Sequence, residues 1–179
     1  FTQNAGSVLS QFDGAVDLTG AFDFTGQALT LNATLGSGST VEISNAGLFT
    51  TGAAGDITAT GAVTQNGAGL NSLAGDITTT GSNIVLGTAV TLTGDVAMST
   101  GMGAGTITFS STVDGTAAGT EDLTLTAGTG DIAFEGAVGG TTRLGAIDIV
   151  SAADVDAKAI SAASLQQQAG TGTTTLAGA

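Results

Sequence analysis

The chain has 179 residues, of which thirty are glycine, and it contains no proline, cysteine, tryptophan, tyrosine or histidine. Its fifteen acidic and two basic residues give a net charge of −13. This charge excludes a nucleic-acid groove and binding to an anionic membrane surface, because both need clustered Lys and Arg. Without cysteine there is neither a disulfide framework nor a thiolate metal site. No apolar run approaches the length of a membrane-spanning helix.

Short segments that alternate apolar and polar residues recur along the chain. They lie at residues 16–18, 22–24, 29–31, 41–43, 84–86, 90–92, 107–109, 123–125, 132–134 and 147–149. A period of two over three to five residues predicts a short strand with one buried face. Glycine interrupts nearly every run, and no stretch of twelve residues has the apolar period of a helix. The sequence therefore predicts an all-β protein with almost no helix.

A tripeptide marks a regular spacing of these strands. Gly-Asp-Ile occurs at 55–57, 75–77 and 130–132, Gly-Asp-Val at 94–96, and weaker copies at 105–107, 153–155 and 172–174. The central positions are 56, 76, 95, 106, 131, 154 and 173, and only the step from 95 to 106 is short. We interpret this short step as a shortened coil or a slipped turn. The spacing predicts a parallel β-helix, or β-solenoid, with coils of about 19–25 residues. A stack of antiparallel sandwich domains is the competing architecture.

The predicted coils assign a direction to individual side chains. We expect the apolar residues Ile57, Ile77, Ile107, Leu123, Leu125 and Ile132 to point into the core. The threonines between them, Thr58, Thr78, Thr108 and Thr124, are expected to face outward.

The beginning of the chain also reappears at its end. Residues 1–6 align with 165–170, and Gly14-Ala15 aligns with Gly178-Ala179, without a gap between the two matches. We therefore expect residues 1–179 to be a single β-solenoid segment that holds one 164-residue repeat and the first 15 residues of the next. Residues 1–15 and 165–179 should have superimposable backbones. The expected partners are further copies of the same segment, stacked head to tail.

Few residues here suit catalysis. There is no histidine or cysteine, the basic residues Arg143 and Lys158 stand apart in the sequence, and no Trp or Tyr offers a platform for a sugar. We expect no catalytic or cofactor-binding residue and no enzymatic activity.

Two patterns indicate other sites. Asp56, Asp76 and Asp95 would form a column of carboxylates if the coils stack in register, and calcium would relieve their repulsion. The alternative is that each Asp caps its own turn through a nearby amide. Thr-x-Thr triplets begin at residues 58, 78, 91, 106, 124 and 173, as on ice-binding solenoids, although unequal coils spoil a flat lattice. Ordinary strand propensity of threonine explains them equally.

Residues 121–130 and 130–142 resemble the repeats of giant bacterial surface proteins, the β-strand-repeat or filamentous-haemagglutinin-like exoproteins, and residues 162–175 resemble a junction between repeats. The resemblance implies a right-handed parallel β-helix, export across a Gram-negative envelope, and an extracellular or cell-surface location. We therefore expect a structural module of a fibre, stalk or surface layer. An adhesin segment that binds a glycan or host surface through one Thr/Asp face is the alternative.

Overall fold

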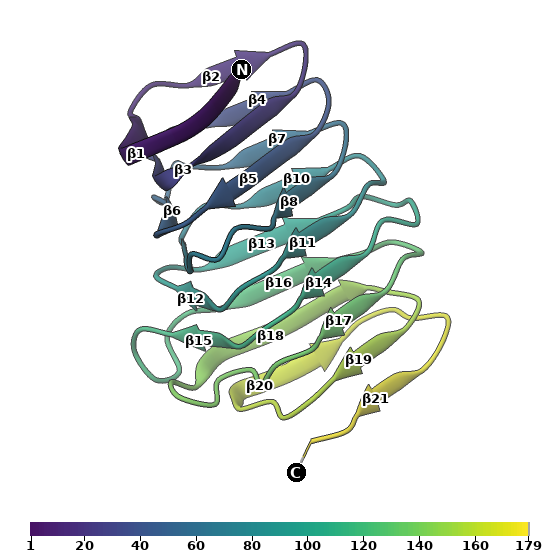
Figure 1. Cartoon of the computed structure of the whole chain (residues 1–179). Coiled ribbons are helices and arrows are strands. Elements are labelled where there is room, and N and C mark those ends of the chain that lie inside the picture. Colours follow the sequence, from purple (N-terminus) through teal and green to yellow (C-terminus); the bar gives the residue numbers. More distant parts are fainter. Residues whose placement is uncertain (179) are drawn as a thin grey trace.

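The chain winds into a β-solenoid of about eight turns, with successive turns about 21 residues apart. This architecture comes from a computed structural model that describes residues 1–178. Figure 1 shows the turns stacked in chain order from the N-terminus to the C-terminus. Every registered strand pair, such as β7 (Ile57–Ala59) with β10 (Ile77–Thr79), is parallel, and residues 1–178 contain no helix. The predicted all-β solenoid is confirmed, and the sandwich alternative is wrong.

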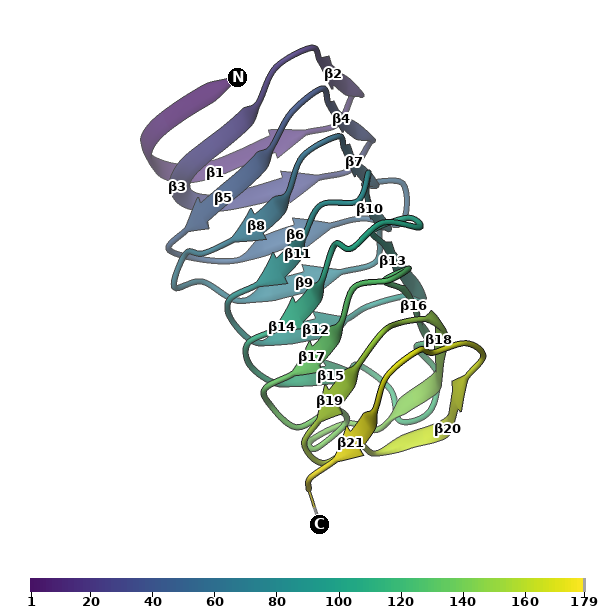
Figure 2. The ribbon, with the colours of Figure 1, turned by 90° about the vertical axis from the view of Figure 1, so that its right-hand side faces the viewer.

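Each turn has three sides, which we name face 1, face 2 and face 3 in the order in which the chain visits them (Figure 2). Face 1 contains β2 (Val16–Leu18), β4 (Leu35–Ser37), β7, β10, β13 (Val96–Ser99), β16 (Leu123–Thr126), β18 (Leu144–Ser151) and β20 (Ala162–Gln167). Face 2 contains the first half of β3 (Phe22–Leu31), β5 (Val41–Asn45), β8 (Val63–Gln65), β11 (Ile84–Leu86), β14 (Ile107–Phe109), β17 (Ile132–Phe134), β19 (Val155–Ala157) and β21 (Thr174–Leu176). Face 3 contains the second half of β3, β6 (Phe49–Thr51), β9 (Asn71–Leu73), β12 (Val90–Leu92) and β15 (Val113–Gly115).

Two features adjust this regular pattern. β1 (Thr2–Phe12) lies along the whole of β3, and both strands run across faces 2 and 3 without a break. Below β15, face 3 continues only as single bridges from Val113 to Val138 and from Val138 to Ile160.

The core runs along the solenoid axis and is made by alternate residues of each strand. Ile57, Ile77, Ile107, Ile132, Leu123 and Leu125 are all buried, as predicted. The intervening Thr58 and Thr78 are exposed, and Thr108 and Thr124 are half-buried on the same outer surface. Because each strand covers the one below, a side chain such as Ile107 packs between its register partners Ile84 and Ile132.

The short step between Asp95 and Thr106 has a different cause from the one predicted. Asp95 precedes β13 on face 1, whereas Thr106 precedes β14 on face 2. The two residues therefore belong to neighbouring sides of one turn, and no coil is shortened there. Because a glycine followed by Asp or Thr can begin a strand on either face, the tripeptide alone does not identify the face.

The predicted identity of the two chain ends is wrong at the level of the backbone. Residues 2–12 form one strand over faces 2 and 3, whereas the corresponding segment contains the end of β20 on face 1, a turn, and β21 on face 2. Ala179 lies outside the described residues. The side chains nevertheless keep one shared pair, because Gln3 and Ser10 are hydrogen-bonded as are Gln167 and Thr174.

Candidate functional site

Aspartates at the start of strands bond to the next turn of the solenoid. On face 1, Oδ1 of Asp56 accepts the backbone N–H of Asp76 at 2.9 Å, and Oδ1 of Asp76 accepts that of Ala97 at 2.8 Å. Further along this face, Oδ1 of Asp95 accepts the N–H of Asp122 at 2.9 Å, and Oδ1 of Asp122 accepts that of Ala146 at 2.6 Å. Each acceptor and its donor are 20 to 27 residues apart.

Face 2 repeats the arrangement at the same position in its strands. Oδ1 of Asn83 accepts the N–H of Thr106 at 3.0 Å. Oδ1 of Asp131 accepts the N–H of Asp154 at 3.0 Å, and Oδ1 of Asp154 accepts that of Thr173 at 2.6 Å. In each case the residue that follows the side chain begins a strand, so the bond lies at the corner where the chain enters the face.

These bonds complete the strand ladders at the corners. The N–H of Ile57 already donates to the carbonyl of Asp76, which is the first regular bond of the ladder. The backbone N–H of Asp76 has no strand carbonyl of the neighbouring turn as its acceptor, because the chain before Ile57 is still turning there. The Asp56 carboxylate is its acceptor instead. These hydrogen bonds lie at the exposed surface of the corners, where each gives a backbone N–H an acceptor within the protein. The aspartates therefore join one turn to the next, whereas the alternative interpretation had each Asp cap its own turn through a nearby amide.

The predicted column of Asp56, Asp76 and Asp95 is only partly formed. Asp56 and Asp76 lie in register, since Ile57 pairs with Ile77. The register then shifts by two residues, because Ile77 pairs with Met98. The residue in register with Asp76 on the next turn is therefore Ala97 and not Asp95. Asp95 instead stands in register with Asp122. Among residues 1–178, no three His, Cys, Asp or Glu side chains gather in a group that could hold a metal ion.

The Thr-x-Thr triplets are distributed over all three faces. The triplets that begin at 58, 78 and 124 lie on face 1, that at 91 on face 3, and those at 106 and 173 on face 2. Only Thr58 and Thr78 are direct neighbours in a ladder, and β13 separates them from β16. The triplets therefore form no continuous flat array, which removes the structural basis for an ice-binding face.

A buried polar network, which the sequence pattern was not expected to form, occupies the corner between faces 2 and 3. Nε2 of Gln65 donates to Oδ1 of Asn45 at 2.7 Å and to the carbonyl of Gly67 at 3.0 Å. Nδ2 of Asn71 donates to the carbonyl and hydroxyl oxygens of Thr88, at 3.2 and 3.1 Å. Oδ1 of Asn71 is buried without a partner. The sequence contains one signal for this network, because the alternation in β8 and β9 places the polar residues Gln65 and Asn71 at inward positions.

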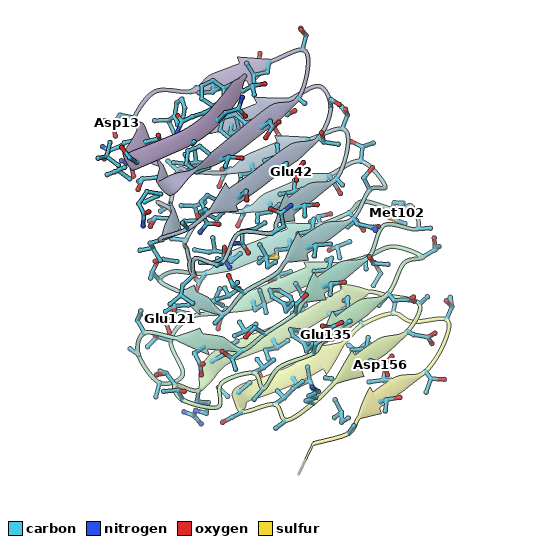
Figure 3. All side chains as sticks on the ribbon, in the orientation of Figure 1. Asp13, Glu42, Met102, Glu121, Glu135 and Asp156 are labelled. Atoms are coloured by element: carbon cyan, nitrogen blue, oxygen red, sulfur yellow. The ribbon has the colours of Figure 1, made fainter. Side chains whose placement is uncertain are left out.

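Glu121 is the one largely buried acid of the described chain, at 6% exposure. It closes the loop between β15 and β16, where its carboxylate accepts the Thr116 hydroxyl and the backbone N–H of Ala117. Burial raises the pKa of Glu121, but these hydrogen bonds outweigh it and the pKa lies below the usual value of 4.5. Glu121 thus stays ionised and shapes the loop, which projects at the edge of the molecule in Figure 3.

The largest hollow on the surface, of about 470 Å³, lies over the lower turns of face 2. Glu135, Asp156 and Lys158 line it together with Phe134 and three alanines. Glu135 directly follows β17, Asp156 lies in the neighbouring β19, and both are exposed (Figure 3).

The comparisons with known proteins give no guide to function. No protein family, curated protein or solved structure matches this chain. Residues 1–178 also include no helix long and apolar enough to cross a membrane.

Proposed function

We propose that this chain is a structural rod segment of an extracellular bacterial fibre, stalk or surface layer, without catalytic activity and without a required cofactor. The observation that carries the proposal is the continuity of the ladders along the axis. Face 1 is a single eight-stranded sheet in which each strand pairs with the next turn, and the apolar core is continuous beneath it. Such a stack transmits load along its axis through many backbone hydrogen bonds at once.

The aspartate caps support a rod whose turns are fastened at the corners as well as within the faces. Each cap joins one turn to the next by a hydrogen bond to a charged group, which is stronger than a neutral one. The excess of acids on the outside also suits an exposed surface that must remain soluble. The family resemblance of residues 121–142 points in the same direction.

The proposal is tested with a chain of several 164-residue copies viewed by electron microscopy. We expect straight rods that lengthen by roughly 37 Å per copy, from the ~4.8 Å spacing of stacked strands. Flexible or globular particles would contradict a rod. Binding of the same rods to a glycan array, with a defined sugar preference, would favour the adhesin alternative.

Head-to-tail stacking of copies is part of this proposal. Within residues 1–178, the outer edges of β1 and β20 carry no further strand, and Phe1, Leu165 and Leu176 at the two ends are 44%, 40% and 54% exposed. Unpaired strand edges with apolar side chains are templates for another strand. Because like charges oppose the contact, salt or millimolar calcium should promote it.

Light scattering of the 179-residue chain tests this stacking. Filament growth should increase with salt and should be abolished by Leu165→Asp/Leu176→Asp, with Met102→Ser as the control on the side of the rod. A chain that stays monomeric at every salt concentration would refute head-to-tail stacking, while the rod shape of covalent arrays would still be testable.

A further inference from the structure

The corner between faces 2 and 3 carries a row of exposed apolar side chains. Val8, Leu9, Leu48 and Leu70 are 71%, 51%, 47% and 57% exposed. They stack from turn to turn: Leu9 and Ala28 are register partners, the N–H of Leu29 donates to the carbonyl of Leu48, and the N–H of Phe49 donates to that of Leu70. We call this row the leucine corner. It holds half of the large apolar side chains that the described chain exposes.

Two shallow hollows lie beside the leucine corner. One of about 330 Å³ is lined mainly by small residues, among them Gly6, Gly26, Ala46 and Gly67. The other, of about 280 Å³, lies between the stacked turns 46–48 and 68–70. Gly67 is required by close backbone contact, because a Cβ there would meet the Asn45 amide nitrogen at 2.2 Å, whereas a Cβ on Gly6 or Gly26 would meet side chains. The same corner thus offers both projecting leucines and shallow hollows lined mainly by glycine and alanine.

The distribution of charged residues indicates which kind of partner can cover the leucine corner. Residues 43–55 and 57–75, which supply the middle of the corner, contain no acidic or basic residue, although the whole chain has a net charge of −13. Glu42 lies on face 2, where Asn66 donates to it at 2.8 Å. Two copies of this chain repel each other over most of their surfaces. They can approach closely where neither carries a charge, and the leucine corner is such a place.

We propose that the leucine corner is a side-by-side contact between two copies of this chain, related by a two-fold axis across the rods. In this arrangement Leu48 and Leu70 of each copy enter the hollows of the other, so the contact is self-complementary. It goes beyond the proposed head-to-tail stacking, because it joins rods laterally. Four turns at ~4.8 Å give a contact only ~20 Å long. A single corner of that length is too small to bury the roughly 800 Å² per partner of a stable dimer. One contact is therefore weak, and arrays strengthen it by multivalency.

Sedimentation velocity of the intact chain tests the contact, in a Leu165→Asp/Leu176→Asp background that blocks stacking at the ends. We expect a concentration-dependent dimer that salt strengthens. Leu48→Ser/Leu70→Ser should weaken association at least about tenfold. Met102→Ser should leave it unchanged, because Met102, although 84% exposed, projects from a different corner (Figure 3). Association that is equal in both variants, or a strict monomer at millimolar concentration, would overturn the proposal.

A cross-linking experiment tests the geometry independently of affinity. The chain has no cysteine, so a single Ala68→Cys places one thiol beside Leu70, at a residue that lines both hollows. Oxidation should join two Ala68→Cys copies by a disulfide. The matched control Thr80→Cys, also exposed but next to face 1, should remain largely monomeric. Equal yields of cross-linked dimer from the two variants would overturn the two-fold arrangement.

Discussion

At the scale of the residue, the aspartates show how one side chain can complete a sheet. A carboxylate placed one residue before a strand reaches the amide of the next turn, which the turning backbone leaves without an acceptor. The same role occurs on two faces and is filled once by Asn83, so an oxygen acceptor is what the position requires. Negative charge is an addition that strengthens the bond but brings acids of neighbouring turns together.

Replacing Asp76 separates the hydrogen bond from the charge. Asp76→Ala removes the acceptor of the Ala97 amide and should cost about 1 kcal/mol of unfolding free energy, like the loss of a helix cap. Asp76→Asn keeps an oxygen at the same place and should cost less, since it also relieves the repulsion from Asp56. Urea denaturation of the three chains gives the comparison. Equal losses for Ala and Asn would mean that the charge matters and the hydrogen bond does not.

The same positions allow the calcium hypothesis to be tested. If calcium bridges Asp56 and Asp76, millimolar calcium should raise the Tm of the parent chain and leave Asp56→Asn/Asp76→Asn unaffected. Magnesium is the control for a general effect of divalent cations. An equal rise in Tm for both chains would mean that calcium acts only by screening charge and does not bridge Asp56 and Asp76.

Glu121 makes stability depend on acid in a predictable direction. Its folded pKa lies below its unfolded value, so its contribution is complete above the unfolded pKa and is lost as the pH falls through the folded pKa. We expect Glu121→Gln to flatten the loss of unfolding free energy as the pH falls below about 4.5. Glu135→Gln, at an exposed position, is the control for the smaller net charge. Parallel pH profiles for parent and Glu121→Gln would contradict this role.

At the scale of the element, each strand is too short to be stable alone. Most have three residues, so a strand contributes two inward side chains and gains its stability from the strands above and below. The buried polar pair Asn45 and Gln65 follows the same logic, because its donors and acceptors come from successive turns. Strands and corners therefore form together with their neighbours.

Ile132→Asp tests this dependence at the centre of a ladder. Ile132 is 1% exposed and lies between Ile107 and Val155. An unpaired carboxylate there should cost about 4–5 kcal/mol or more, and hydrogen exchange should show protection lost in the turns above and below together. Thr108→Asp, on the outer surface of the adjacent strand, should change stability by less than about 1 kcal/mol. Loss of protection confined to β17 would contradict cooperative stacking.

At the scale of the whole molecule, the two chain ends show how residues 164 apart in the sequence are placed on the three faces of the solenoid. The pair Gln3 and Ser10 lies on faces 2 and 3, whereas the equivalent pair Gln167 and Thr174 lies on faces 1 and 2. The interval from Gln3 to Gln167 therefore does not contain a whole number of turns. If 164-residue copies follow one another in a longer chain, equivalent residues would move by one face from each copy to the next, and a surface such as the leucine corner would spiral around the rod.

We predict that a chain of four joined 164-residue copies repeats its surface only after three copies. Cryo-electron microscopy should show successive copies related by a rotation close to one third of a turn, with the twist of the solenoid added. A rotation near zero between neighbouring copies would mean that β1 takes a different place when a turn precedes it.

The sequence by itself determined the local structure of this protein. Alternation predicted ten short segments, from 16–18 on face 1 to 147–149 in β18, and each lies in a strand of the structure with its alternate side chains buried or half-buried. This succeeded because burial of every second residue depends only on the neighbouring residues. The parallel solenoid followed from the spacing of these strands. The tertiary structure decided which residues from different turns become neighbours. Turns of unequal length move the register, so Asp76 meets Ala97 and not Asp95, and Asp95 and Thr106 stand on different faces. The leucine corner arises in the same way, because residues 9, 48 and 70 come together only when the turns between them have closed.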